Sequence, residues 1–380
     1  MKIDVSSMNI TLLMIGQLLV ATVLGVLNIP LPASLSTYLL VIFLSLILLA
    51  QKKSIKKSRH SAFKIYEVIL CCTALTSFIF MGIGKYPLQK FLLFMYLIVV
   101  PILLLDLIFR SQQNLESLNK LKLYLNIVAY ISIWWGMTLF VLGYGVSYEG
   151  TSRITLVGID NPIWTSRYLG ALVIALYFTA KNRYSPFFLC TVAVAFFIMI
   201  QTGTRGTFLA LAAAIIISSG KKVISVRTFL VFLGAMMVLA LLVFYVGGRL
   251  GLGGGDYSVI ARTVSYQKAV EYISLQPLLG YGFGNYSIIT TGVDERDYPH
   301  NLILEFGFEM GMLTCLIFLM YIFSRLKMKR KELDFIYALF VFHFVNSLFS
   351  GDIPGNNLLF ISGYVLAIYY SFNTTKSKTI

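Results

Sequence analysis

The chain has 380 residues, of which 58% are hydrophobic and only 12% are charged, and its formal net charge is +15. A mean hydropathy of +0.82 is more than a water-soluble domain can hide in its core, so the composition excludes an ordinary soluble protein. The basic residues punctuate the apolar runs instead of forming one block, which argues against a nucleic-acid-binding surface.

Long apolar runs recur along the whole chain, and most are long enough to cross the hydrocarbon core of a bilayer as helices. The sequence therefore predicts an all-α, polytopic integral membrane protein with about twelve transmembrane helices. The predicted spans are 9–27, 33–50, 65–83, 91–109, 123–144, 163–180, 187–203, 207–219, 228–247, 301–323, 335–349 and 357–372.

The positions of lysine and arginine predict the orientation of these spans. If the N-terminus is cytoplasmic, most of the 31 basic residues fall in cytoplasmic connections, as the positive-inside rule requires. An even number of spans then places both termini in the cytoplasm. Since no composition shift or internal repeat divides the chain, we expect a single membrane domain over 1–380.

One predicted external connection, residues 248–300, is much longer than the others, and such loops in compact proteins are usually functional or disordered. It begins with the glycine-rich stretch "GGRLGLGGG", which is typical of a hinge. Next comes an amphipathic helix, expected to lie on the membrane surface or to cap a cavity. Its predicted apolar face consists of Val259, Thr263, Tyr266, Val270 and Ile273.

Arg205 lies in "QTGTRGTFLA", at the predicted external tip of a tight helical hairpin. Gly203 and Gly206 flank it and would let the backbone approach a ligand closely. The alternative is an arginine that reaches for lipid headgroups. Because Arg205 stands alone on the side that disfavours basic residues, we favour a functional role. Two further external arginines, Arg262 in "ARTVSYQKAV" and Arg153 in "TSRITLVGIDNP", have similar placements and weaker signals.

His300 is one of only three histidines and stands where the long loop meets the tenth span, in "RDYPHNLILEFGFEMGM". Asp297 as N-cap and Pro299 in the first turn would place His300 in the first turn of that helix. The helix dipole and partial burial would both keep its imidazole neutral, which suits a general base. From these residues alone, an interfacial histidine that only caps the helix is an equal alternative.

Polar residues continue from His300 into the tenth span. Asn301 and Glu305 lie one helical turn apart, and Glu309 extends the same face. Acidic side chains within a span are costly, so each suggests a functional site, although Glu305 could instead pair with an arginine. Gly307 and Gly311 form the pattern G-x-x-x-G, which is typical of close helix packing.

The acidic run Asp294, Glu295 and Asp297 could hold a divalent cation, but the sequence supplies no second ligand cluster beside it. We therefore predict a solvated loop and no metal site. Guanidinium groups bind phosphate oxygens bidentately, and a lipid-linked diphosphate presents such oxygens at the outer membrane surface. External arginines beside a neutral base would thus suit transfer from such a donor to a hydroxyl group.

The motifs "TGTRGTFLA", "ART..Y", "PLLGYGFGN" and "HNLILEFGFEMG", in this order, resemble the O-antigen ligase and polymerase family of bacterial surface polysaccharide assembly. The resemblance covers about residues 150–312. It implies a membrane glycosyltransferase with a C-type (GT-C-like) fold that transfers glycan from undecaprenyl diphosphate with inversion, without a metal or other cofactor. The family's catalytic arginines fall on Arg205 and Arg262, and its histidine falls on His300. One departure is Tyr266, where the family often has tryptophan.

We expect Arg153, Tyr266, Asn301 and Glu305 to bind substrate. The resemblance also implies a location in the bacterial inner membrane, with the active site on the external face. Expected partners are the lipid-linked oligosaccharide, an acceptor glycan, the bilayer, and a flippase and chain-length regulator, but no nucleic acid. A polymerase of O-antigen or capsule is slightly favoured over the alternative, an O-antigen ligase that attaches glycan to lipid A core. A small-solute transporter, for bicarbonate for example, is an alternative of another class.

Overall fold

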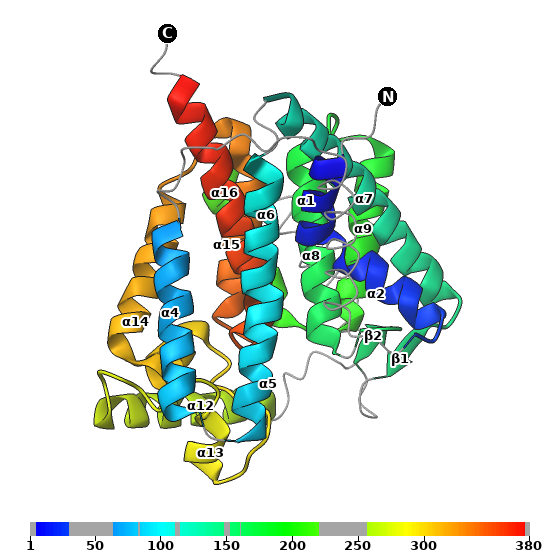
Figure 1. The fold of residues 1–380 in the computed structure, drawn as a ribbon. Coiled ribbons are helices and arrows are strands. Elements are labelled where there is room, and N and C mark those ends of the chain that lie inside the picture. Colours follow the sequence, from blue (N-terminus) through cyan, green and yellow to red (C-terminus); the bar gives the residue numbers. More distant parts are fainter. Residues whose placement is uncertain are drawn as a thin grey trace. The chain divides into compact units, whose positions relative to one another are not determined.

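The computed structural model describes residues 5–29, 64–82, 84–110, 115–147, 153–159, 161–219 and 257–376. These residues are almost entirely helical, with one two-stranded hairpin, which confirms the predicted all-α class (Figure 1). The predicted spans at 33–50 and 228–247 and the glycine-rich stretch after 246 lie outside the described residues.

The chain divides into two compact units, Met1–Lys56 with Ile108–Gly253 and Lys57–Leu107 with Gly254–Ile380. The helices and strands of the first unit are α1 (Val5–Ile15), α2 (Gln17–Val26), α7 (Leu115–Val141), β1 (Gly145–Ser147), β2 (Ile154–Leu156), α8 (Pro162–Thr179), α9 (Pro186–Gln201) and α10 (Arg205–Ser219). The two strands pair antiparallel, Val146 opposite Thr155, in a connection for which the sequence analysis predicted no strand.

The second unit contains α4 (Lys64–Met81), α5 (Lys85–Phe94), a π-helical turn (Met95–Val99), most of α6 (Val100–Arg110), α12 (Tyr257–Leu275), α13 (Tyr286–Thr291), α14 (Leu302–Leu326), α15 (Asp334–Ser347) and α16 (Asn357–Lys376). Short 3₁₀ turns, Lys331–Leu333 and Pro354–Asn356, precede α15 and α16. The helices α15 and α16 form the apolar core of this unit, with residues such as Leu339, Phe340 and Val365 fully buried.

Three helical stretches of the described chain are long and apolar enough to cross a membrane: Lys85–Asp106, Leu118–Val141 and Leu302–Leu326. A fourth candidate is the pair Ser7–Ile15 and Gln17–Val26, whose axes differ by 74°. The predicted span 9–27 is therefore two helices that meet at Gly16. The helices Ile65–Met81, Pro186–Gln201 and Arg205–Ser219 are apolar but shorter. The structure thus supports membrane-spanning helices, and the full number of twelve stays a prediction.

Two helices of the first unit begin where local sequence requires it. The Asn161 side chain accepts a hydrogen bond from the Ile163 backbone nitrogen at 2.8 Å, and Pro162 occupies the first position of α8. Ser185 and Pro186 repeat this arrangement at the start of α9. A capping side chain followed by proline satisfies a free backbone N–H and presets the backbone, so both helices start within one residue of their predicted positions.

The predicted amphipathic helix of the long loop is α12, which ends at Leu275, just before Gln276 and Pro277. It runs crosswise at one end of α4 and α14 (Figure 1). Its packed face agrees with the predicted one in part, since Ile273 packs against buried residues of this unit. Ala269 is buried against Phe308 and Tyr286, whereas the Val270 side chain is 55% exposed. Apolar residues occur on several faces of α12, so hydrophobicity alone could not tell which face meets protein.

Helix α14 is interrupted at Gly311, whose φ of 80° lies in the left-handed region that favours glycine. The segment 277–284 contacts the interruption: Tyr281 N donates to Phe308 O at 2.8 Å, and Met312 N donates to Pro277 O at 2.7 Å. A Cβ on Gly311 would lie 2.0 Å from the Leu278 carbonyl oxygen. The interpretation of Gly311 as a helix-packing glycine was therefore wrong, because the residue allows a loop to dock into a broken helix.

Candidate functional site

Arg205 is the first residue of α10 and follows a turn of three residues, 202–204, after α9. The turn is held by Thr202, whose hydroxyl donates to Met199 O at 2.6 Å, and by Gly203, whose φ is 65°. Arg205 is exposed at the tip of this hairpin. The structure therefore confirms the predicted tight hairpin, and Gly203 is the glycine of the pair that uses a left-handed backbone.

Arg153, just before β2, lies against the same turn. Its guanidinium Nη2 donates to the Gly203 carbonyl oxygen at 3.2 Å, and a Cβ on Gly203 would lie 3.1 Å from Arg153 Nε. Within the first unit, the structure thus brings Arg153 to the turn that carries Arg205. The close approach gives a reason for glycine at 203 beyond its backbone angle.

In the second unit, α14 begins at Leu302 and its N-cap is Asn301. The Asn301 side-chain oxygen accepts from Ile303 N at 3.0 Å and from Leu304 N at 3.2 Å, while its Nδ2 donates to Leu348 O at 3.2 Å. The prediction that Asp297 caps this helix and that His300 lies in its first turn was wrong. Asn301 caps the helix instead of Asp297, because its amide nitrogen Nδ2 is held by the Leu348 carbonyl oxygen at the end of α15.

His300 immediately precedes the cap and has a left-handed backbone, with φ of 55°. This conformation is unfavourable for a residue with a Cβ, and it persists only where the surrounding structure holds it. The imidazole packs on the Tyr298 ring, with centroids 4.5 Å apart. Its Nδ1 is buried and has no hydrogen-bond partner within the described chain. An orphaned polar atom of this kind suggests a place where a ligand or water completes the hydrogen bonding.

The electrostatic surroundings keep the His300 imidazole neutral. Burial lowers its pKa from the usual 6.5, and the Arg262 and Arg296 guanidinium groups lower it further, against the opposite effect of Asp297 and Asp352. The structure therefore brings Arg262 of α12 into electrostatic reach of His300. Tyr266, one turn along α12, is half-buried, and burial raises its phenol pKa, whereas Arg262 lowers it.

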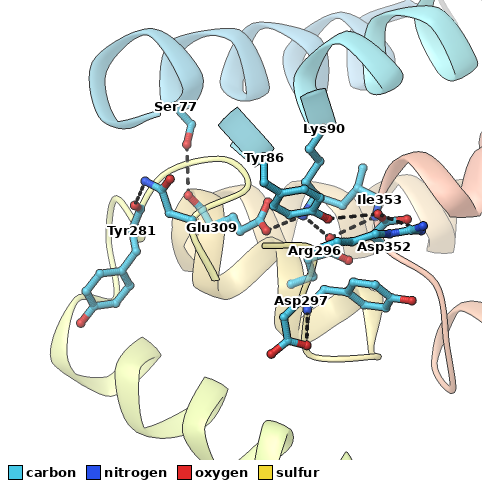
Figure 2. A network of polar contacts seen from close by, with 12 residues as sticks. Ser77, Tyr86, Lys90, Tyr281, Arg296, Asp297, Glu309, Asp352 and Ile353 are labelled. Carbon is cyan, nitrogen blue, oxygen red and sulfur yellow. Dashed lines mark hydrogen bonds and ion pairs between the residues drawn. The ribbon is translucent and has the colours of Figure 1, made fainter. Parts of the chain in front are cut away.

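Glu305 and Glu309 lie deeper along α14 and share a cation that the sequence analysis did not assign. Lys90 of α5 donates to both carboxylates, and all three side chains are 0% exposed. Figure 2 shows Lys90 and Glu309 of this group. Glu305 Oε1 also accepts from the Ile353 backbone nitrogen at 3.1 Å. Among the described residues, the second oxygen of each carboxylate is buried and lacks a side-chain hydrogen-bond partner. Glu305 therefore pairs with a lysine and not with an arginine.

The sequence analysis assigned no role to Lys90 or Arg296, nor to Tyr86 and Asp352. The Tyr86 hydroxyl donates to Asp352 Oδ2 at 3.3 Å, and Arg296 Nη2 lies 3.5 Å from the same oxygen (Figure 2). The available signal was a charged residue within or beside an apolar run, the criterion that flagged Glu305. Applied to Lys90 and Asp352, it would have found this network.

The acidic run has a structural use. Asp294 accepts hydrogen bonds from Lys85 N at 2.6 Å and Tyr86 N at 3.0 Å, and so caps the start of α5 from a distant part of the chain. Asp297 Oδ1 accepts from the neighbouring Tyr298 N at 2.8 Å. Within the described ranges, no three His, Cys, Asp or Glu side chains gather in a way that could hold a metal ion.

Comparison with protein families gives one match: residues 190–319 match the family model Wzy_C, described as O-antigen ligase. The match covers about a third of the chain, from α9 to most of α14, and includes Arg205, Arg262 and His300 but not Arg153. Comparison with curated proteins gave no match. Residues 190–319 are therefore similar to the O-antigen ligase family, as the motifs of the sequence indicated.

Proposed function

We propose that this protein is a membrane glycosyltransferase of surface polysaccharide assembly, which transfers glycan from undecaprenyl diphosphate to an acceptor hydroxyl. The observation that carries the proposal is a histidine of lowered pKa, His300, within electrostatic reach of Arg262, both inside the matched domain. A neutral base beside a guanidinium suits a reaction that removes a proton from a hydroxyl and releases an anion.

In the proposed reaction, the acceptor hydroxyl oxygen attacks the anomeric carbon of the donor, and His300 takes the hydroxyl proton. The bond between the anomeric carbon and the diphosphate oxygen breaks, with inversion, and the lipid diphosphate leaves with the electron pair. Guanidinium groups stabilise the charge that develops on the leaving group, so the proposed reaction needs no metal or other cofactor. We assign this role to Arg205 in the first unit and to Arg262 in the second.

Four further side chains are proposed to contact substrate, and their observed contacts differ. Arg153 lies at the turn of Arg205, and half-buried Tyr266 lies on α12 near Arg262, so both suit glycan or phosphate contacts. Asn301 already uses its amide to cap α14, and Glu305 is buried against Lys90. A substrate role for these last two therefore requires the substrate to displace or share an existing contact.

We also propose the membrane arrangement that the sequence predicts. It has about twelve spans in one domain of the GT-C type, both termini in the cytoplasm, and residues 248–300 on the external face of the inner membrane. The crosswise orientation of α12 supports this arrangement, because an amphipathic helix at a membrane surface lies across the spans. Its exposed apolar residues, including Ile260, Val264 and Leu275, suit contact with lipid.

A polymerase is slightly favoured over a ligase, because the external loops other than residues 248–300 are modest. The acceptor would then be another lipid-linked repeat unit, and a flippase and a chain-length regulator would act beside the enzyme. The decisive experiment supplies the protein in detergent with a lipid-diphosphate oligosaccharide. Chain growth with release of undecaprenyl diphosphate supports a polymerase, and transfer only to lipid A core supports a ligase.

A small-solute transporter is a second candidate, and the 74° bend between α1 and α2 favours it, because broken helices form the central sites of many transporters. The same protein in proteoliposomes separates the two classes. Solute uptake together with a silent transfer assay would overturn the proposed glycosyltransferase. Activity that persists in EDTA would agree with the proposed metal-independent reaction.

A further inference from the structure

Arg296 lies on the same short segment as His300. Its exposed guanidinium pairs with a buried carboxylate, that of Asp352. Its side chain is 57% exposed, whereas the side chain of its partner Asp352 is only 4% exposed. Asp352 is the fixed end of the pair, because its Oδ1 accepts from Gly355 N at 3.0 Å and its Oδ2 accepts from the Tyr86 hydroxyl at 3.3 Å. The buried Asp352 carboxylate thus contacts one side of the Arg296 guanidinium, while the rest of this guanidinium is exposed.

The ion pair does not use the full capacity of the guanidinium. The distance of 3.5 Å from Nη2 to Asp352 Oδ2 is long beside the roughly 2.8 Å of a strong charge-assisted hydrogen bond. An arginine has five N–H donors in a planar fork, and one long contact with Asp352 engages few of them. The exposed side of the guanidinium therefore keeps donors for a ligand.

The Arg296 guanidinium and the His300 imidazole both lie near the ring of Tyr298. Its guanidinium carbon lies 5.8 Å from the centroid of the Tyr298 ring, and that ring packs on the imidazole. The segment that carries these three residues is fixed at both ends, by Asp294 on α5 and by Asn301 on α14. The backbone that carries Arg296 and His300 is therefore held on both sides of these residues.

Four charged groups on three elements act on His300. They are Arg262 from α12, Arg296 and Asp297 from the segment before α14, and Asp352 from the connection between α15 and α16. The two guanidinium groups belong to different elements, and the buried His300 Nδ1 makes no hydrogen bond within the described residues. An oxyanion would pair with the two guanidinium groups, and a hydroxyl group beside it would supply the hydrogen bond that the imidazole nitrogen lacks.

We propose that Arg296 is a further donor-binding residue, a guanidinium preset by Asp352 that binds diphosphate oxygens together with Arg262. The proposal rests on the proposed function and deepens it, since it adds a phosphate ligand on the segment of the base. Arg296 then supports departure of the lipid diphosphate, and the bound anion raises the proton affinity of His300 when the acceptor hydroxyl is deprotonated.

Inorganic pyrophosphate and farnesyl diphosphate serve as probes in a binding test on the full-length protein in detergent. Arg296→Gln should weaken binding of both probes by about tenfold or more, the effect of losing one charge-assisted contact. Arg296→Lys should recover part of the affinity, because the charge returns without the planar fork. Lys331→Gln, which removes an exposed charge of the same unit, should change nothing.

A second readout does not depend on activity. In histidine NMR, pyrophosphate should raise the pKa of His300 in the wild type, and this rise should shrink in Arg296→Gln. Asp352→Asn should retain probe binding if it folds, since it frees the guanidinium from its partner. Unchanged probe affinity in Arg296→Gln would overturn the proposal, and so would an unchanged rise of the His300 pKa in that variant.

The test also separates the two proposals. If the wild type binds the probes through Arg296 but transfers no glycan, the site is an anion site and the proposed function fails. If the wild type transfers glycan and Arg296→Gln does so with unchanged KM for the donor, the proposed function stands and the assignment of Arg296 fails.

Discussion

His300 packs its imidazole on the ring of Tyr298, with the two planes inclined by 57°, and does so from a left-handed backbone. The cost of that backbone is about 1–2 kcal/mol for an ordinary residue. A position that only required a helix cap would not need it, because Asn301 performs that task. The relationship thus favours the interpretation of His300 as a base over that of a cap.

The first prediction concerns the identity of this side chain. His300→Asn and His300→Gly both suit a left-handed backbone, so we expect folded variants. Glycan transfer should fall by about 100-fold or more, in line with the loss of a general base, while donor binding survives. Added imidazole should restore part of the activity of His300→Gly but not of His300→Asn. Near-normal turnover in either variant would make His300 a structural residue.

The second prediction concerns pH. The pKa of His300 lies below 6.5, so turnover should be constant above that pH and fall as the pH drops through the lowered value. The folded protein binds this proton less readily than the unfolded chain. The contribution of His300 to the free energy of unfolding is therefore fully present above pH 6.5 and is lost as the pH falls through the folded pKa.

Arg262→Gln provides the check on that assignment, because removing the cation should raise the pKa of His300 and move the acid limb of the rate profile to higher pH. Histidine NMR measures the same shift without turnover. An acid limb that stays in place in Arg262→Gln would contradict the electrostatic link between these two residues.

The third prediction concerns the hairpin arginine. Arg205→Ala should raise KM for the donor or lower kcat by roughly 10–100-fold, the effect of losing a charge-assisted bidentate contact, while the protein stays folded. Arg205→Lys should retain part of the activity. The matched control is Arg183→Ala, because Arg183 belongs to the same unit and stacks over Tyr177 at 4.4 Å. Equal effects of the Arg205 and Arg183 substitutions would assign Arg205 to the fold.

The fourth prediction concerns the buried cation. Lys90→Met leaves two buried carboxylates without their shared partner, and we expect a loss of about 3–5 kcal/mol in the free energy of unfolding. Thermal unfolding in detergent measures it. Lys90→Met combined with Glu305→Gln and Glu309→Gln should recover most of the loss, since these three positions then carry no buried charge. A triple variant as unstable as the single one would show that packing, not charge, makes Lys90 necessary.

The fifth prediction concerns the interrupted helix. Gly311→Ala should destabilise the protein by at least about 1–3 kcal/mol, because the left-handed backbone is strained for alanine and the methyl group meets Leu278 O. Limited proteolysis should then cleave within 277–284. Gly307→Ala is the control, since its methyl group meets the movable end of Ile273 at 3.1 Å and Met312 Sδ at 3.6 Å, and no backbone atom. Similar losses in the two variants would contradict the docking of this loop.

Local features of the sequence predicted much of the fold. The apolar runs predicted helices, including two that begin within one residue of α8 and α9. The "TGTRGT" stretch predicted the hairpin of Arg205, and the amphipathic pattern after residue 256 predicted α12. These signals are local, because capping, proline geometry and hydrophobic periodicity involve residues a few positions apart.

The sequence by itself predicted the membrane class, the similarity to the O-antigen ligase family and a neutral His300. Only the tertiary structure decided which of two good capping residues, Asp297 or Asn301, begins α14, and it did so through Leu348 O at the end of α15. The same holds for Lys90, whose partners Glu305 and Glu309 lie more than 200 positions away in the chain. Contacts at such separation depend on how helices pack, and no local pattern of residue types records that packing.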